Sequence, residues 1–335
     1  MKKFILITFI ILLVGLFAFH FFAANQAEKE INEAIQQQVE ASGASLSVQY
    51  SSIEVSPFSG DILFKDVTIT EQTNIERTRA MNVDLAYLDF LNIYLGGVQY
   101  GLKQLTTGNI TLSKISYLDR TSLQEFSMDT LNIRYSGNMW DAIQSIAANR
   151  RTAYAHQVDL SGTNGKYTKP QSSVGTFTAD SAFSKFKVPK GATQWSRDGV
   201  HNLTFKNVLW SPPSSFQNNY GFFIQGFGYQ LDAIPFKEMG GSYSMTNNSE
   251  IMVNEGIASN ELFTAKFDGT IETDSTWADA EFSPLNISLV DLSSQFKNVI
   301  TNIEQLLGLN LPAQSDGIHF QLVGPVSNPS MQQGQ

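Results

Sequence analysis

The chain has 335 residues, 31 acidic and 22 basic side chains, a formal net charge of -9 and no cysteine. The lack of cysteine excludes disulfides, thiolate metal sites and a cysteine nucleophile. The acidic balance argues against binding to the phosphates of nucleic acid. Charged residues make up only 16% of the chain, against about a quarter in an average soluble domain. Such a low content of charged residues is typical of an exported, β-rich protein.

The N-terminus carries a long apolar run. Lys2 and Lys3 precede the segment Phe4–Ala24, which has no formal charge unless His20 is protonated. A helix of this length reaches about 31 Å, enough to cross the hydrocarbon core of a membrane. The two lysines are expected to remain in the cytoplasm, so the rest of the chain lies outside it. We therefore predict an uncleaved single-pass transmembrane anchor over 1–25, with a cleaved signal peptide as the alternative.

The remainder is predicted to be mostly β with a few helices. Apolar residues at helical spacing predict helices over 27–42, 140–148 and 289–307. Elsewhere apolar and polar residues alternate as in strands, including a strand at Gly221–Leu231. The polar stretch Gly162–Gly175 is the one candidate boundary, which divides the exported part into 26–165 and a C-terminal β-rich region over 166–335, continuous with the first.

One strand pattern occurs three times. Two apolar pairs flank two polar residues in each copy: Ile62, Phe64, Val67 and Ile69; Ile110, Leu112, Ile115 and Tyr117; Leu203, Phe205, Val208 and Trp210. Strict alternation would place the two pairs on opposite faces, whereas one extra residue, a β-bulge, keeps all four on one face. Unless the repetition is chance, the pattern predicts a curved, elongated antiparallel sheet with an apolar groove. Its candidate lining residues are Phe64, Val67, Leu112, Ile115, Phe205 and Val208.

The sequence has no recognisable catalytic motif. The four histidines are far apart, and neither the zinc motif His-Glu-x-x-His nor the nucleophile elbow Gly-x-Ser-x-Gly occurs. Asp274, Asp279 and Glu281 could gather around a metal ion, but acidic residues on exposed strand faces are far commoner. We therefore expect a protein that is not an enzyme, without a catalytic residue, cofactor or metal site.

Two parts of the chain resemble the AsmA family of envelope proteins. Leu46–Thr70 and Met81–Asp119 resemble the family's opening, in which an anchor and a helix lead into paired strands with a Pro/Gly turn. Leu311–Pro329 resembles its closing segment, and type II secretion system protein N closes in a similar way. The resemblance implies an inner-membrane anchor and a periplasmic body with a curved β-groove, in a family linked to phospholipid transport and outer-membrane assembly.

A long apolar sheet face has to be covered by helices or by acyl chains. Each buried methylene group stabilises binding by roughly 0.8 kcal/mol. The first hypothesis is therefore a non-enzymatic envelope biogenesis factor that binds or transfers phospholipid through the groove. Its expected partners are the membrane, phospholipid acyl chains and other envelope proteins, and not nucleic acid. The alternatives are a structural or secretion-machinery protein with a closed core, and an enzyme or glycan-binding module.

Overall fold

The computed structural model describes most of the chain beyond residue 21. The described residues are 22–37, 39–40, 46–56, 59–84, 100, 103–147, 150–169, 175–192, 199–230, 232–246, 250–272, 280–307, 313–314, 316–326 and 329–333. The anchor expected at Phe4–Ala24 therefore lies almost wholly outside the described residues. Within those residues, no helix combines the length and apolar character that a membrane crossing needs.

Among these residues, 16 strands form one open antiparallel sheet. Strands from β3 to β13 pair in chain order, β15 follows β13, β1 and β2 pair with β3, and β14 and β16 pair with β15. The first eight are β1 Leu46–Gln49, β2 Ser52–Ser56, β3 Asp61–Glu71, β4 Asn74–Asp84, β5 Thr107–Asp119, β6 Gln124–Ser136, β7 His156–Thr168 and β8 Thr176–Val188. The others are β9 Gly199–Ser211, β10 Ile234–Thr246, β11 Glu250–Ser259, β12 Thr264–Glu272, β13 Glu281–Val290, β14 Ala313–Gln314, β15 Gly317–Pro325 and β16 Ser330–Gln333.

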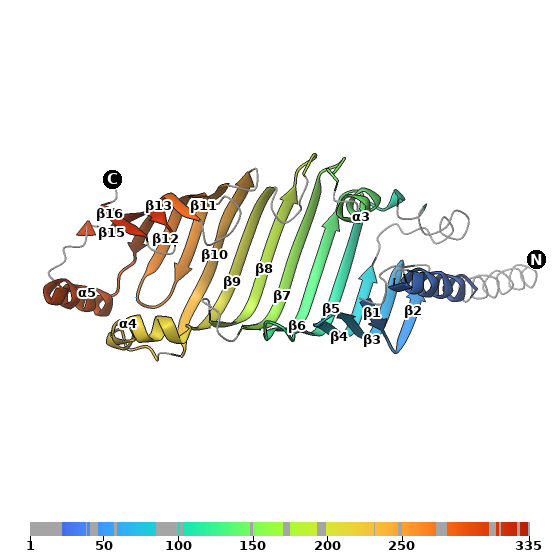
Figure 1. Ribbon diagram of the computed structural model, residues 1–335, viewed down its shortest axis with the longest axis horizontal. Helices are drawn as coiled ribbons and strands as arrows, with labels where there is room; N and C mark the ends of the chain where they lie inside the picture. Colours follow the sequence, from blue (N-terminus) through green and yellow to red (C-terminus); the bar gives the residue numbers. More distant parts are fainter. Residues whose placement is uncertain are drawn as a thin grey trace, which may run out of the picture.

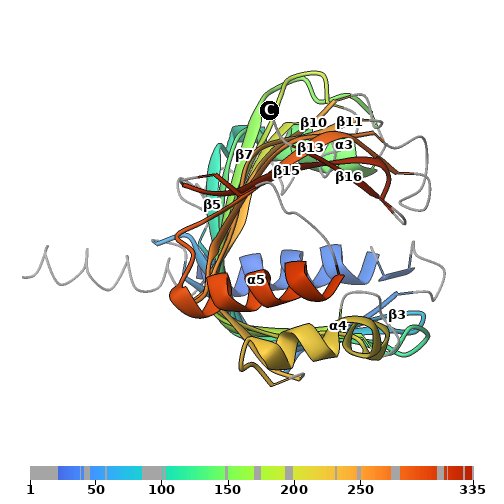
Figure 2. The ribbon, with the colours of Figure 1, turned by 90° about the vertical axis from the view of Figure 1, so that its left-hand side faces the viewer.

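The sheet is elongated along the order of its strands and curved across them. Figure 1 shows the strands following one another along the long axis, and Figure 2 shows that they curve around a concave side. The predicted mostly β class with a curved, elongated antiparallel sheet is confirmed to this extent. The boundary expected between 165 and 166 falls inside β7, which pairs with both β6 and β8. The two expected regions are therefore halves of one sheet.

Helices lie at both ends of the sheet and along its rims (Figure 1). They are an N-terminal helix over 22–37, α3 Met139–Ala147, α4 Ser214–Gly226 and α5 Ser294–Leu307. Helix α5 starts later than the expected residue 289 because Leu289 belongs to β13 and the Ser293 hydroxyl accepts a hydrogen bond from the Phe296 amide at 3.1 Å. Such a bond caps a helix N-terminus.

The strand expected at Gly221–Leu231 is wrong, because helix α4 continues to Gly226. Gly228 then takes a left-handed conformation, with φ of 82°, and ends the helical segment. The aromatic residues of the segment favour strands by propensity, and contacts made just after α4 oppose that preference: the ring of Phe227 stacks on Phe296 of α5 with centroids 5.1 Å apart.

A row of polar residues crosses the outer face of the sheet. One residue in each of β3, β5, β7 and β9 is left-handed, with φ of 50° to 54°: Asp66, Lys114, Asn164 and Asn207. The pairing does not shift there, because Lys65 pairs with Ala80 and Val67 with Thr78 in the same register. The expected β-bulge, with an extra residue, is therefore wrong.

The left-handed residue explains, without a bulge, why both apolar pairs of the pattern lie on one face. Adjacent side chains such as Lys65-Asp66 and Ser113-Lys114 line one depression on the outer face. Two consecutive outward positions reset the alternation, so Ile62, Phe64, Val67 and Ile69 all pack in one core cluster.

Hydrogen bonds between neighbouring strands hold the polar row. Asp129 receives a bond from the Lys114 ammonium at 2.6 Å and another from the Asn164 amide at 2.8 Å. These bonds, first that from Lys114 and then that from Asn164, hold the pKa of the Asp129 carboxyl below its usual value. Two strands further on, the Asn207 amide donates to Asp180 at 2.9 Å. Asn tolerates the left-handed conformation better than most residues, which suits it to this row.

Candidate functional site

The concave face carries cross-strand rows of apolar side chains. One row connects the two ends of the sheet through successive registered pairs: Phe64, Met81, Leu112, Leu131, Gly162, Ala182, Phe205, Met239, Ala258, Ala265, Leu289 and Ile318. Twelve strands at about 4.8 Å spacing make this row roughly 50 Å long. We call the face that carries it the inner face.

Two further rows lie beside the first on the inner face. Between β5 and β9 the nearer row reads Ile115, Met128, Gly165, Ala179 and Val208. The next row is aromatic throughout: Tyr117, Phe126, Tyr167, Phe177 and Trp210. The rings of Phe177 and Trp210 stack with their centroids 6.1 Å apart. The two rows hold no charged residue from β5 to β9, so the apolar character of this part of the face suits contact with hydrocarbon.

Helical side chains cover the inner face at both ends. At the N-terminal end, Ala27 of the first helix belongs to the core cluster of Phe64 and Val67. At the C-terminal end, Phe296 of α5 packs against Ile318 and Leu262. Figure 2 shows both helices on the concave side of the sheet. The two ends of the inner face are therefore filled in the manner of an ordinary core.

A hollow of about 460 Å³ opens on the inner face between these ends, over β6 to β10. Its lining includes Phe126, Met128, Tyr167, Phe177, Ala179, Ala182, Phe205, Val208 and Met239. The size falls within the usual range for small-molecule sites, ~300–1,000 Å³. Among the described residues, the core cluster beneath the N-terminal helix and the core cluster beneath α5 share no residue with this lining.

All six residues expected to line the groove lie on the inner face, but in different surroundings. Phe64 and Val67 are buried beneath the N-terminal helix. Leu112 and Ile115 are half-buried on β5. Phe205 and Val208 line the hollow. The register thus brings the six onto two adjacent rows, and the first helix removes two of them from any ligand.

Several hollow residues were missed because glycine replaces the apolar residue of the pattern. In β7 the positions equivalent to Leu112 and Ile115 are Gly162 and Gly165. A Cβ at Gly162 would lie 2.2 Å from the Met128 sulfur, and one at Gly165 would lie 3.2 Å from its methyl carbon. The Met128 side chain therefore occupies the space that β7 leaves. The sequence signal here is the polar pair Thr163-Asn164, which stands where β3 has Lys65-Asp66 and β5 has Ser113-Lys114.

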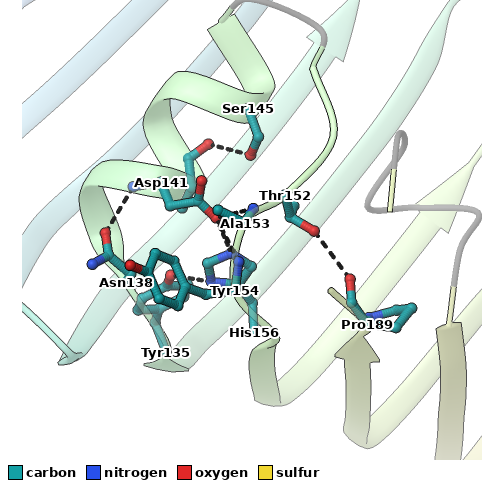
Figure 3. A network of polar contacts seen from close by, with 10 residues as sticks. Tyr135, Asn138, Asp141, Ser145, Thr152, Ala153, Tyr154, His156 and Pro189 are labelled. Atoms are coloured by element: carbon teal, nitrogen blue, oxygen red, sulfur yellow. Dashed lines mark hydrogen bonds and ion pairs between the residues drawn. The ribbon is translucent and has the colours of Figure 1, made fainter. Parts of the chain in front are cut away.

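A buried polar network near α3 is the other cluster with chemical potential (Figure 3). His156 contacts the Tyr135 hydroxyl through Nδ1 at 2.6 Å and the Asp141 carboxylate through Nε2 at 3.2 Å. Asp141 also accepts the backbone amides of Ala153 and Tyr154 at 2.9 and 3.1 Å. Local sequence patterns do not predict this cluster, because its members come from separate elements.

The geometry of this network fits a structural role. Asp141 and His156 are both buried, and the carboxylate ties the segment before β7 to helix α3. Burial, together with the nearby Asp141 carboxylate, raises the pKa of the Tyr135 hydroxyl far above its ordinary value. A phenol with a raised pKa is a poor nucleophile and base at neutral pH. Among the described residues, no group of three or more potential ligands could hold a metal ion.

Comparison with protein-family models, curated proteins and solved structures finds no match to this chain. The family resemblance therefore rests on the sequence motifs alone.

Proposed function

We propose that this protein binds phospholipid acyl chains along its inner face and serves, without catalysis, as a lipid-handling factor of the cell envelope. In this proposal the N-terminal segment is an inner-membrane anchor and the sheet lies in the periplasm, as in the AsmA family that the sequence resembles. The observation that supports it most is the uncovered apolar hollow in the middle of a face whose two ends are filled.

The energetics favour an acyl chain as the occupant. A 16-carbon chain that buries its methylene groups gains roughly 10 kcal/mol before the costs of ordering are subtracted. The hollow's aromatic and aliphatic lining needs no specific polar partner to bind hydrocarbon. The bilayer surface itself is a less suitable partner, since the net charge of -9 opposes attraction to anionic headgroups.

A structural or secretion-machinery role remains the second candidate, because the ends of the inner face are closed. Phe64 and Val67 at one end and Phe296 at the other are buried among protein side chains. If a partner protein covers the middle in the same way, the sheet is a scaffold and the hollow is part of an interface.

Filling the hollow tests the proposal. Ala182 lies on the inner face opposite Phe205, and its neighbour Phe183 is 45% exposed on the outer face. We expect Ala182→Trp to occupy the hollow, whereas Phe183→Trp places the same indole outside it. The full-length protein, in one mild detergent, is mixed with a phospholipid that carries a fluorescent acyl chain, and the fluorescence that comigrates with protein on a native gel is measured.

The matched pair removes the contribution of the anchor, which is identical in both variants. We expect Ala182→Trp to lose most of the comigrating fluorescence and Phe183→Trp to keep the wild-type level. Equal retention by both variants would show that the hollow is not where acyl chains bind.

A further inference from the structure

His201 places an imidazole among the apolar side chains of the inner face near its rim. His201, on β9, belongs to the registered row of Tyr135, Val158, Phe186 and Tyr243. Its ring is stacked between two aromatic rings, with centroids 5.8 Å from Phe186 and 4.9 Å from Tyr243. Only 6% of the residue is exposed. The next two inner-face positions of this strand, Leu203 and Phe205, are apolar.

The His201 Nε2 atom is buried and has no hydrogen-bond partner among the described residues. Such an atom is unfavourable, because it has lost its bonds to water and gained none in return. Burial also lowers the pKa of His201, which favours the neutral imidazole near pH 7. Among the described residues, the other buried atom of this kind is the Tyr229 hydroxyl, which lies in the cluster that α5 covers, whereas His201 shares strand β9 with Phe205 and Val208 of the hollow.

His201 and the hollow lie on one face of one strand. Phe205 lines the hollow, and four residues at about 3.3 Å each place it roughly 13 Å from His201. Alternation puts His201, Leu203 and Phe205 on the same side of β9. The His201 Nε2 atom, which lacks a hydrogen-bond partner, is therefore separated from the apolar hollow by a distance that a short acyl segment can span.

We propose that His201 Nε2 hydrogen-bonds to the oxygen of an acyl carboxyl or ester group, with the hydrocarbon of the same ligand in the hollow. This inference rests on the proposed function, because it assigns a direction to the acyl chain on the inner face. In a neutral imidazole one ring nitrogen donates and the other accepts; with the proton on Nε2, that atom donates to a carbonyl or carboxyl oxygen, and without a charge it offers no ion pair to a phosphate. His201 then distinguishes acyl lipids from plain hydrocarbon.

Three probes with one hydrocarbon part separate the roles of oxygen and chain. They are 1-pyrenedecanoic acid, its methyl ester and 1-decylpyrene, titrated by pyrene fluorescence against the full-length protein in one mild detergent. His201→Phe keeps a stacking ring and removes the nitrogen. We expect it to weaken binding of the acid, the ester or both by about 3- to 10-fold, the loss of one hydrogen bond, and to leave 1-decylpyrene unchanged.

Two further variants act as controls. His201→Gln retains a donor and an acceptor, and it should recover part of the lost affinity if it folds as the wild type does by circular dichroism. His319→Phe makes the same exchange on β15, where the imidazole contacts Ser288 and Asp316, and it should alter none of the three titrations.

The probes also distinguish the two sources of the oxygen. An effect confined to the acid identifies a free fatty acid, and an effect on the ester identifies a phospholipid-type ester. No change in any titration of His201→Phe, an equal change in all three, or the same loss in His319→Phe would overturn the inference. If none of the probes binds even the wild-type protein, the proposed acyl-chain binding itself is wrong, and the inference fails with it.

Discussion

Phenylalanine-to-alanine changes at two positions of one inner row should have unequal effects on stability. Phe64 is 8% exposed, packs beneath the N-terminal helix and makes an edge contact with Tyr50 at 5.9 Å. Removing a ring from such a site leaves a cavity and costs about 3–5 kcal/mol. Phe205 stands in the same row but lines the open hollow, so its removal creates no enclosed void.

The expected loss at Phe205 is therefore smaller. Full burial of a Phe side chain is worth about 1.5–3 kcal/mol, and the half-buried ring should lose about half of that. Phe205→Ala should then cost about 0.8–1.5 kcal/mol, at least about 1.5 kcal/mol less than Phe64→Ala. Equilibrium urea unfolding of delipidated protein, followed by circular dichroism, measures both, with Phe183→Ala on the outer face as control. Equal losses at Phe64 and Phe205 would refute the idea that the middle of the inner face is open.

Four other changes test separate parts of the structure. Val67→Asp should destabilise the fold by several kcal/mol because it buries an unpaired carboxylate, whereas Thr68→Asp should cost little; urea midpoints compare them, and similar losses would contradict the one-face arrangement. Asn207→Ala should be less stable than Asn207→Gly by about 1–2 kcal/mol, because glycine tolerates the left-handed backbone; a more stable alanine variant would argue against that conformation. Asp141→Ala should cost about 3 kcal/mol by leaving buried amide donors without an acceptor, and rapid amide exchange at Ala153 and Tyr154 would identify the lost contacts. Burial lowers the pKa of His201, so its contribution to stability is present above the unfolded pKa and is lost as the pH falls from there through the lower folded pKa; between pH 7 and pH 5 the His201→Phe variant should lose less stability than the wild type, and equal losses would oppose this.

The repeated strand pattern predicted the inner face because its apolar positions are those whose side chains face the concave side of the sheet. Phe64, Leu112 and Phe205 were recognised as equivalent positions, and the registers place them in one row. The predicted cause of the pattern is wrong, because a β-bulge and a left-handed residue both place two polar residues in succession between the apolar pairs. Asp66 and Lys114 show the difference only through their backbone angles.

Features that depend on contacts between distant segments could not be derived from local patterns. Helix α4 consists of residues that also suit a strand, and the contact of the next residue, Phe227, with Phe296 of α5 lies far away in the sequence. Gly162 and Gly165 hide a fourth copy of the strand pattern because the side chain that fills their space, Met128, lies on another strand. The burial of the unpaired His201 nitrogen likewise depends on Phe186 and Tyr243, the rings that the two neighbouring strands contribute.

Site-specific photocrosslinking in cells tests the central claim most directly. A photoreactive phenylalanine analogue is placed at Leu112, at Phe205, at Phe64 or, as an outer-face control, at Ser113, and the adducts of the full-length protein are identified by mass spectrometry. Open acyl-chain binding predicts phospholipid adducts at Leu112 and Phe205, none at Ser113, and at Phe64 only crosslinks to the covering N-terminal helix. Adducts at Leu112 and Phe205 that contain only protein would contradict the account.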